Sequence, residues 1–440
     1  MSAASGFVAI DFGTSNSAVA LPQGAAGVRL VELEPGQRTM PTATFYRGDT
    51  PAHAPEAEQL FGRAALAAYI EGSDGRLMRS MKSILGSPLL DQSTDIGAGR
   101  AVRYRDVLSG YLGQLMRTAQ AQAQTETPLR RAVLGRPVFF VDDDPMRDAQ
   151  AQAALAEAAH QVGLEEIAFQ YEPIAAALDH ESRIDHEQLV LVADIGGGTS
   201  DFSLVRLGPQ RRQRVERRDD ILANHGVHLA GTDFDRHVAL ASIMPLLGYG
   251  ASRPAMSGDK PGAKPREVPS GAYFDLATWH LINTVYAPAR IAELRGMKPW
   301  YADPLHHQRL MVTLEDRLGH ALAAAAEQAK IDVATSGNAL IDLQLLQRSL
   351  QAELQEPQAA AAIEADLQRI VQAALVTVKM AGLSVDAVDV LYFTGGSTGL
   401  RPLVDRIQAE FGRAQQVRGD RFASVAQGLG LFARQVFGPG

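Results

Sequence analysis

The chain has 440 residues, 46% of them hydrophobic and 21% charged, a balance typical of a folded protein with two or more domains. Its formal net charge is -8, so we predict no broad basic surface for nucleic acid or anionic lipid, and it has no cysteine, which excludes disulfides, thiolate metal sites and cysteine nucleophiles. The sequence has neither an export signal pattern at its start nor a run of about 18 apolar residues, so we expect a cytoplasmic protein without a membrane partner.

Two segments share one pattern: an apolar strand, an aspartate, a turn rich in Gly, Thr and Ser, and a second strand with alternating apolar residues. The first is FVAIDFGTSNSAVAL at 7–21, and the second is LVLVADIGGGTSDFSLVRL at 189–207. The pattern predicts a β-hairpin with a polar turn in each segment. Strands and helices alternate after both hairpins, so we interpret the chain as a duplication of one α/β lobe.

Further elements follow from local patterns. The run DDDP at 142–145 precedes an alanine-rich stretch at 149–162, which predicts a capped helix start rather than a metal site. Apolar spacing also predicts a short buried strand at 388–394 and helices over residues 318–333, 359–381, 400–411 and 422–437.

Two segments carry no clear periodicity. Residues 248–271 are rich in Gly, Pro and Ser, which predicts a loop or mobile insertion. Five arginines crowd into 211–218 with acidic residues among and beside them. We interpret this cluster as a solvated hairpin end in preference to a nucleic-acid patch.

The turn after Asp11 has the residues of a phosphate site. Gly13 lets the backbone approach a ligand closely, and the amides of Thr14 and Ser15 can donate to phosphate oxygens. Asp11, at the strand end, is placed to hold a hydrated Mg²⁺. The turn at 194–201 repeats this pattern with three glycines. One such turn alone predicts only a hairpin, whereas two would clamp a polyphosphate and its metal from both sides.

A third glycine-rich turn, TGGST, ends the predicted strand at 388–394. The three turns together resemble the actin-like ATPase superfamily, which includes actin, sugar kinases and the seventy-kilodalton heat-shock chaperones. The finer resemblance is to the DnaK-like ATPase domain of the heat-shock branch, and within it to short bacterial YegD-type relatives without a peptide-binding domain. The likeness to the heat-shock branch rests on QRTMPT at 37–42, KSILG at 82–86, YEPIAAA at 171–177, GVHLAGTDFD at 226–235 and EQAK at 327–330. We expect the likeness to the YegD-type relatives because no peptide-binding segment follows the predicted helix at 422–437.

The resemblance implies an α/β protein with a duplicated actin-like, ribonuclease H-like fold. Two lobes, each with a mixed five-stranded sheet flanked by helices, would enclose a nucleotide cleft. Lobe I would span residues 1–186, with its core at 6–38 and 107–186 and a smaller subdomain at 39–106. Lobe II would span residues 187–440, with its core at 187–225 and 350–440 and a smaller subdomain at 226–349.

The resemblance also implies roles for single residues. Lys82 would orient the attacking water and neutralise developing charge, and Asp11 and Asp194 would hold Mg²⁺ through water. Glu172, Asp194 and Asp201 would position that water or accept its proton, and Thr199 would be the remaining catalytic residue. Phosphate contacts would come from Thr14, Ser15, Gly196, Gly197, Gly198 and Thr199, and Gly13 and Asn16 would also belong to the nucleotide-binding residues. Adenosine contacts would come from Glu327, Lys330, Gly395, Gly396 and Ser397.

The implied activity is slow, Mg²⁺-dependent hydrolysis of ATP to ADP and phosphate, driving a conformational switch in protein folding and quality control. The implied partners are an unfolded-protein client, a co-chaperone or an exchange factor. One departure is Ile331, which stands after Lys330 where the family has an arginine that packs on adenine. Two alternatives stay open: a nucleotide-binding scaffold whose hydrolysis has decayed, and a small-molecule kinase of the same fold.

Overall fold

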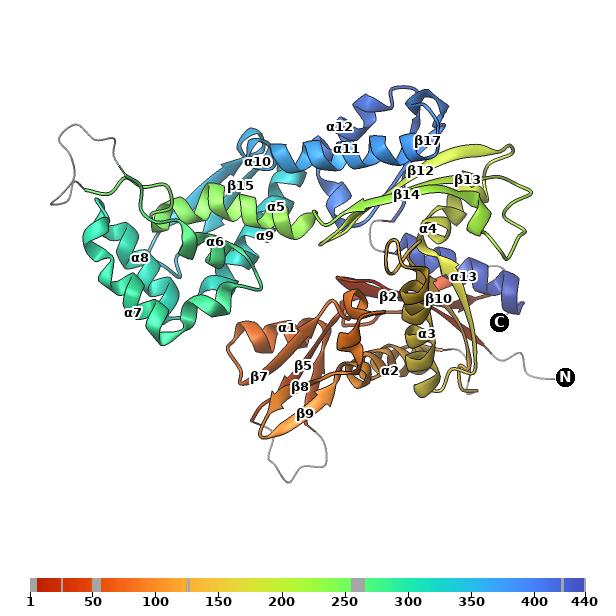
Figure 1. Cartoon of the computed structure of the whole chain (residues 1–440), viewed down its shortest axis with the longest axis horizontal. Helices are drawn as coiled ribbons and strands as arrows, with labels where there is room; N and C mark the ends of the chain where they lie inside the picture. The colour runs from red at the N-terminus through yellow and green to blue at the C-terminus, as the bar shows by residue number, and fades with distance from the viewer. Residues whose placement is uncertain are drawn as a thin grey trace. The chain divides into compact units, whose positions relative to one another are not determined.

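The structure is a computed structural model, which describes residues 6–24, 27–49, 57–123, 125, 127–254, 266–420 and 423–438. The chain divides into two compact units (Figure 1). The first unit consists of residues 1–227, 373–398 and 407–440, and the second of residues 228–372 and 399–406. The division into lobes at residue 186 stays a prediction.

The first predicted hairpin is confirmed and belongs to a mixed sheet of the first unit. Strand β1 (Phe7–Phe12) pairs antiparallel with β2 (Asn16–Gln23) and parallel with β10 (Arg131–Arg136). The full order is β11-β10-β1-β2-β3, with β3 at Gly27–Leu30 and β11 at Glu166–Tyr171. A sixth strand, β4 (Thr39–Pro41), also pairs with β2.

The second hairpin forms an equivalent sheet in the same unit. Strand β12 (Gln188–Ile195) pairs antiparallel with β13 (Ser200–Leu207) and parallel with β17 (Val390–Thr394). The outer strands are β14 (Ile221–Val227) and β18 (Gln415–Arg418), which gives the order β18-β17-β12-β13-β14. Chain order and strand direction match the first sheet position by position. The predicted duplication of a mixed five-stranded sheet is therefore confirmed, with β4 as an addition to the first copy.

Successive residues of β1 are apolar because both faces of its sheet are covered. Val8, Ile10 and Phe12 join a core cluster with α2 (Tyr104–Gln122) and α3 (Pro145–Gln161). Phe7 and Ala9 join a different cluster, to which α4 (Glu172–Glu181) and α13 (Ser424–Phe437) contribute. The N-cap prediction for α3 is confirmed, since Asp144 accepts a hydrogen bond of 3.1 Å from the backbone N–H of Arg147.

Helices α4 and α13 touch each other through backbone. A Cβ added to Gly428 of α13 would lie 1.8 Å from the carbonyl oxygen of Ala175 in α4, so only glycine fits there. Residues of both sheets and both helices form one apolar cluster, in which β1, α4, β12 and α13 all take part. This contact therefore ties elements from the two duplicated halves into one core.

Smaller elements extend the first unit between β4 and α2 (Figure 1). A three-stranded sheet has the order β6-β5-β7, and helix α1 packs against it. Two 3₁₀ helices and a hairpin follow it in the chain. The bounds are β5 Ala43–Arg47, β6 Gln59–Phe61, α1 Gly62–Ile70, β7 Gly75–Arg79, the 3₁₀ helices Met81–Ile84 and Pro88–Asp91, β8 Ser93–Gly97 and β9 Arg100–Arg103.

The prediction of one helix over 359–381 is wrong. The structure has two helices, α10 (Glu356–Ala362) and α11 (Glu364–Met380), which are separated at Ile363. The backbone of Ile363 has φ -104° and ψ 6°, and its side chain is buried. Ile363 is buried at the break and stands at a position where a continuous helix would also have an apolar residue. The spacing of apolar residues therefore does not reveal the break.

The prediction of a solvated end for the arginine cluster is wrong at Arg217. This residue is 2% exposed, and its side chain donates to both carboxylate oxygens of Glu181, over 2.8 and 3.0 Å, and to Asp220. Glu181 and Asp220 are buried as well. A buried guanidinium needs such charged partners, and these lie three and thirty-six residues away.

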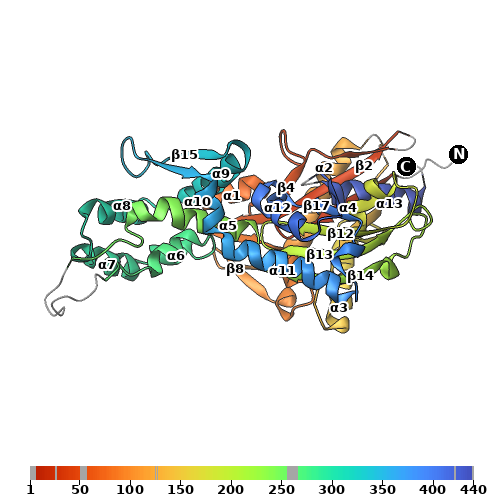
Figure 2. The same ribbon diagram turned by 90° about the horizontal axis from the view of Figure 1, so that it is seen from above.

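The second unit is mostly helical (Figures 1 and 2). The hairpin of β15 and β16 packs against α9 and α10, and α7 packs against α8. The predicted helices 318–333 and 400–411 correspond to α9 and α12. The bounds are α5 Gly231–Val238, α6 Gly271–Ala277, α7 Pro288–Gly296, α8 Pro304–Glu315, α9 Gly319–Ser336, β15 Asn338–Asp342, β16 Gln351–Gln355 and α12 Arg401–Glu410, whose last residues belong to the first unit.

The predicted insertion at 248–271 is described only at its two ends. Ser252 and Glu267 form an antiparallel bridge, and Val268 beyond it is buried. Residues 255–265 lie outside the described residues. Across the part of the chain that the structure describes, no helix is both long and apolar enough to cross a bilayer.

Candidate functional site

The two predicted phosphate turns meet in the first unit. The turn after β1 and the turn after β12 approach so closely that a Cβ on Gly197 would lie 2.8 Å from Oγ of Ser15. The second turn is closed by a 3.0 Å hydrogen bond from the N–H of Gly196 to the carbonyl of Thr199. The structure therefore brings together two segments that are almost two hundred residues apart in sequence.

The first turn requires glycine at its first position. A Cβ at Gly13 would lie 2.2 Å from the carbonyl oxygen of Asn16, which belongs to the same turn. Thr14 and Ser15 are half-buried and Asn16 is exposed. The tight turn leaves the amides of this segment beside a surface that a ligand can reach.

The third turn packs on the second. Gly395 has φ +88°, and a Cβ there would lie 2.4 Å from the carbonyl oxygen of Ile195 and 2.7 Å from Oδ1 of Asp194. The hydroxyl of Ser397 donates to the carbonyl of Gly196 over 2.7 Å. Of the residues predicted to contact adenosine, Gly395 and Ser397 thus contact the second phosphate turn in this structure.

A buried ion pair lies beside the two turns. The ammonium of Lys82, from the 3₁₀ helix Met81–Ile84, is 2.5 Å from Oε1 of Glu172, the first residue of α4. The two side chains are 10% and 15% exposed. Both ends of the pair are fixed by regular structure, although 90 residues separate them in the chain.

Carboxylates crowd around this pair. Burial raises the pKa of Asp11 to about 8, with Glu172 and Asp194 raising it further and Lys82 opposing them. Burial likewise raises the pKa of Asp194 to about 7, helped by Asp201, which lies opposite it across β12 and β13. Burial alone would lower the pKa of Lys82, but the carboxylates of Glu172 and Asp11 outweigh it and the pKa is raised. Carboxyl groups therefore outnumber ammonium groups in this site, and a bound cation would lower the pKa of Asp11 and Asp194.

This donor set fits a divalent cation that keeps its water shell. Mg²⁺ dehydrates reluctantly and binds proteins through one or two carboxylates plus substrate phosphates. In the described ranges no three His, Cys, Asp or Glu side chains converge closely enough to ligate an ion directly. Asp11 and Asp194 are the residues that would hold such an ion through water.

The remaining predicted residues, Glu327 and Lys330, lie on α9 in the second unit. The ammonium of Lys330 contacts Oδ1 of Asp235 at 2.6 Å and the carbonyl of Gly231 at 3.3 Å. Burial raises the pKa of Asp235 to about 6, and Lys330 opposes that rise while Glu327 adds to it. The sequence analysis identified the segment 226–235, which contains Asp235, but it did not predict the pairing of Asp235 with Lys330.

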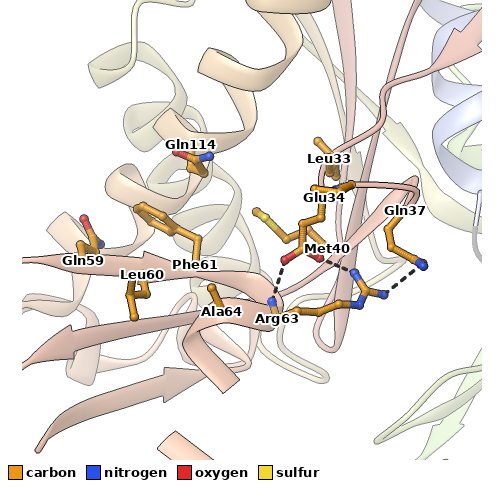
Figure 3. A pocket seen from close by; sticks show the side chains of 11 residues that line it. Leu33, Glu34, Gln37, Met40, Gln59, Leu60, Phe61, Arg63, Ala64 and Gln114 are labelled. Carbon is orange, nitrogen blue, oxygen red and sulfur yellow. Dashed lines mark hydrogen bonds and ion pairs between the residues drawn. The ribbon is translucent and has the colours of Figure 1, made fainter. Parts of the chain in front are cut away.

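A separate hollow of about 490 Å³ lies elsewhere in the first unit (Figure 3). None of the predicted phosphate, metal or catalytic residues lines it. Arg63 and Glu34 face each other there, and Arg63 also donates to the carbonyl of Thr39 over 2.8 Å. These bonds hold the turn that leads into β4. The hollow is therefore distinct from the site at the glycine-rich turns.

Two comparisons with known proteins bear on this site. The family model for the Hsp70 protein matches residues 7–242, which include both phosphate turns, Lys82 and Glu172. The Chaperone protein DnaK of Thermosipho melanesiensis is 30% identical over 233 residues, which are 52% of this chain and 34% of that protein. The chain thus matches about a third of the length of this curated relative. With its duplicated mixed sheets and its paired glycine-rich turns, the chain belongs to the Hsp70 family and has the actin-like ATPase fold.

Proposed function

We propose that this chain binds ATP with Mg²⁺ and hydrolyses it slowly to ADP and phosphate. The observation that carries the proposal is the buried Lys82–Glu172 pair beside Asp11 and Asp194, next to the point where the two phosphate turns meet. Phosphoryl transfer depends on positioning and electrostatic stabilisation more than on covalent chemistry, and this arrangement supplies both.

Each residue has a defined task in this proposal. The amides of the two turns would donate to the phosphates, and bound Mg²⁺ would neutralise part of their charge. Lys82 stays protonated because its pKa is raised, so its ammonium can stabilise the charge that develops on the transferred group. Glu172 orients Lys82 by direct contact. Asp201, which is exposed and lies opposite Asp194 across β12 and β13, would position the attacking water or accept its proton.

The cellular role is a further part of the proposal. The likeness to the Chaperone protein DnaK supports a nucleotide-driven conformational switch in protein folding and quality control. We propose an unfolded-protein client, a co-chaperone or an exchange factor as partner, and the cytoplasm as location. The chemistry at the turns can be tested before any partner is known.

The test combines binding with turnover. Thermal unfolding is measured without ligand and with Mg²⁺ plus ADP or ATP, since a ligand of the native state raises its stability by mass action. Phosphate release from ATP is then followed under single-turnover conditions. Stabilisation with slow phosphate release supports the proposal, and no stabilisation by any adenine nucleotide overturns it. Stabilisation without release indicates a scaffold, and transfer of label to a metabolite indicates a kinase.

A further inference from the structure

We propose that Thr42 is a positioning residue for nucleotide phosphates, because it sets the orientation of the first phosphate turn. The inference rests on the proposed function and adds to it a residue to which neither the sequence nor the comparisons give a role. Thr42 stands between β4 and β5 and is 3% exposed. It therefore acts on a ligand only through the turn that it contacts.

Thr42 holds two carbonyl groups of this turn. Its hydroxyl donates to the carbonyl of Gly13 over 2.7 Å, and its backbone N–H donates to the carbonyl of Ser15 over 2.9 Å. A hydroxyl has one hydrogen, so the 3.0 Å contact between the hydroxyls of Thr42 and Ser17 has Ser17 as its donor. The buried hydroxyl of Thr42 therefore both donates and accepts a hydrogen bond.

These two bonds decide where the amides point. In a trans peptide the C=O and the following N–H point in opposite directions within one plane. Holding the carbonyl of Gly13 therefore turns the N–H of Thr14 away from Thr42, and holding the carbonyl of Ser15 does the same for the N–H of Asn16. Thr14 is predicted to contact phosphate, and Asn16 beside it is among the predicted nucleotide-binding residues.

The same residue also reaches the segment that carries Lys82. The carbonyl of Thr42 accepts a 3.2 Å hydrogen bond from the N–H of Ser80. Ser80 has φ +56° and immediately precedes the 3₁₀ helix Met81–Ile84. The backbone of Thr42 therefore links the first phosphate turn to the residue that would neutralise charge on the transferred group.

The second phosphate turn shows an independent counterpart. Gly196 occupies the position after β12 that Gly13 occupies after β1, in each case two residues past the aspartate. The carbonyl of Gly196 accepts a 2.7 Å hydrogen bond from the hydroxyl of Ser397, which comes from outside that hairpin. Both turns are thus held at the same carbonyl by a hydroxyl from elsewhere in the chain, although the two hydroxyls come from unrelated segments.

The test removes the hydroxyl while keeping the shape of the side chain. Thr42→Val is compared with Thr42→Ser, which keeps the hydroxyl. The matched control is Thr377→Val, because Thr377 is equally buried and its hydroxyl donates to the carbonyl of Ala373 over 2.8 Å inside helix α11. Affinities for ADP and AMP with Mg²⁺ are measured by calorimetry, and thermal unfolding shows that each variant is folded.

We expect Thr42→Val to weaken ADP binding about tenfold, the size expected from losing a buried hydrogen bond that orients a donor. Binding of AMP, which has a single phosphate, should change less than ADP binding does. Thr42→Ser should restore ADP affinity, and Thr377→Val should leave it unchanged. Equal losses for ADP and AMP, or no loss for either, would overturn the inference.

Amide hydrogen exchange without nucleotide keeps this test separate from the proposed function. Thr42→Val should speed exchange in the peptide that covers 13–17, and Thr377→Val should not. Unchanged exchange there overturns the inference even if ADP binds well. If Thr42→Val speeds exchange there but the parent protein binds no ADP, the contact orders the turn, whereas the proposed function is wrong and with it the role toward phosphate.

Discussion

Lys82 and Glu172 form an ion pair of 2.5 Å between a 3₁₀ helix and the first residue of an α-helix, and both side chains are largely buried. Glu172 lies in the first turn of α4, where the helix dipole favours negative charge. The carboxylate is therefore stabilised from two sides. The ammonium of Lys82 also interacts with the carboxyl groups of Asp11 and Asp194.

We predict that Lys82→Ala lowers the single-turnover rate of phosphate release by about 100-fold or more, because it removes a preorganised positive charge from the reacting group. Binding of ADP should persist, since the turns are intact. The measurement is phosphate release from ATP beside a calorimetric affinity for ADP. Lys379→Ala, a change at an exposed lysine of α11, is the control and should leave both quantities unchanged. Unaltered release in Lys82→Ala would remove this lysine from the mechanism.

The stability of the nucleotide-free protein should depend on pH through Asp11. Its pKa is raised to about 8 in the folded state, against 3.8 for the ordinary side chain. Between these values the folded state binds a proton that the unfolded state has released, so the free energy of unfolding falls as pH rises toward 8. Each pKa unit of difference is worth about 1.4 kcal/mol.

Asp11→Asn removes this titration, so we expect the variant to be more stable than the parent at pH 8.5 and to lose less stability between pH 6 and pH 8.5. Urea unfolding in the presence of a chelator measures both differences. The variant should also lose stabilisation by Mg²⁺ and ADP. Asp386→Asn, at an exposed position, serves as control. A pH dependence that is the same in Asp11→Asn and the parent would contradict the prediction.

Lys330→Met should destabilise the second unit at pH 8 by about 1–3 kcal/mol, because it leaves the half-buried carboxylate of Asp235 without its cation. The loss should be smaller at pH 5, where Asp235, with its pKa already raised to about 6, takes up a proton. Denaturant unfolding at the two pH values measures this. Adding Asp235→Asn should restore stability at pH 8, and Lys298→Met, at an exposed lysine, should have little effect.

Arg217→Met should cost about 3–5 kcal/mol of stability, because Glu181 and Asp220 would remain buried without their shared cation. The matched control is Arg214→Met in the same segment, where the side chain is exposed and a change near zero is expected. Equilibrium unfolding in urea compares the two. A change in stability near zero for Arg217→Met as well would mean that the ion network contributes little to the fold.

Local sequence patterns predicted the parts of the fold that short-range physics determines. The hairpins at 7–21 and 189–207 and the capped start of α3 depend on residues next to one another, so they could be recognised without the structure. The same holds for the glycine at position 13, where the tight turn itself excludes a side chain.

Contacts between residues that are far apart in the sequence could not be predicted in this way. The pairing of Lys330 with Asp235 joins residues 95 positions apart, and the contact of Thr42 with Gly13 spans 29 positions. The residues next to Arg217 in the sequence are as polar as those next to the exposed Arg214. Arg217 is buried because it pairs with Glu181 of α4, which is distant in the sequence. The periodicity of a sequence does not show which distant residue will pair with a given side chain.

The packing of α13 has a consequence for how the protein is made. Strands β1 and β2 are synthesised early, yet Phe7 and Ala20 are buried in a cluster with residues of helix Ser424–Phe437, such as Leu429. At about 5–20 residues per second, that helix leaves the ribosome tens of seconds later. During that interval this face of the sheet lacks the helix that buries it, and exposed apolar surface of this kind favours aggregation of the nascent chain.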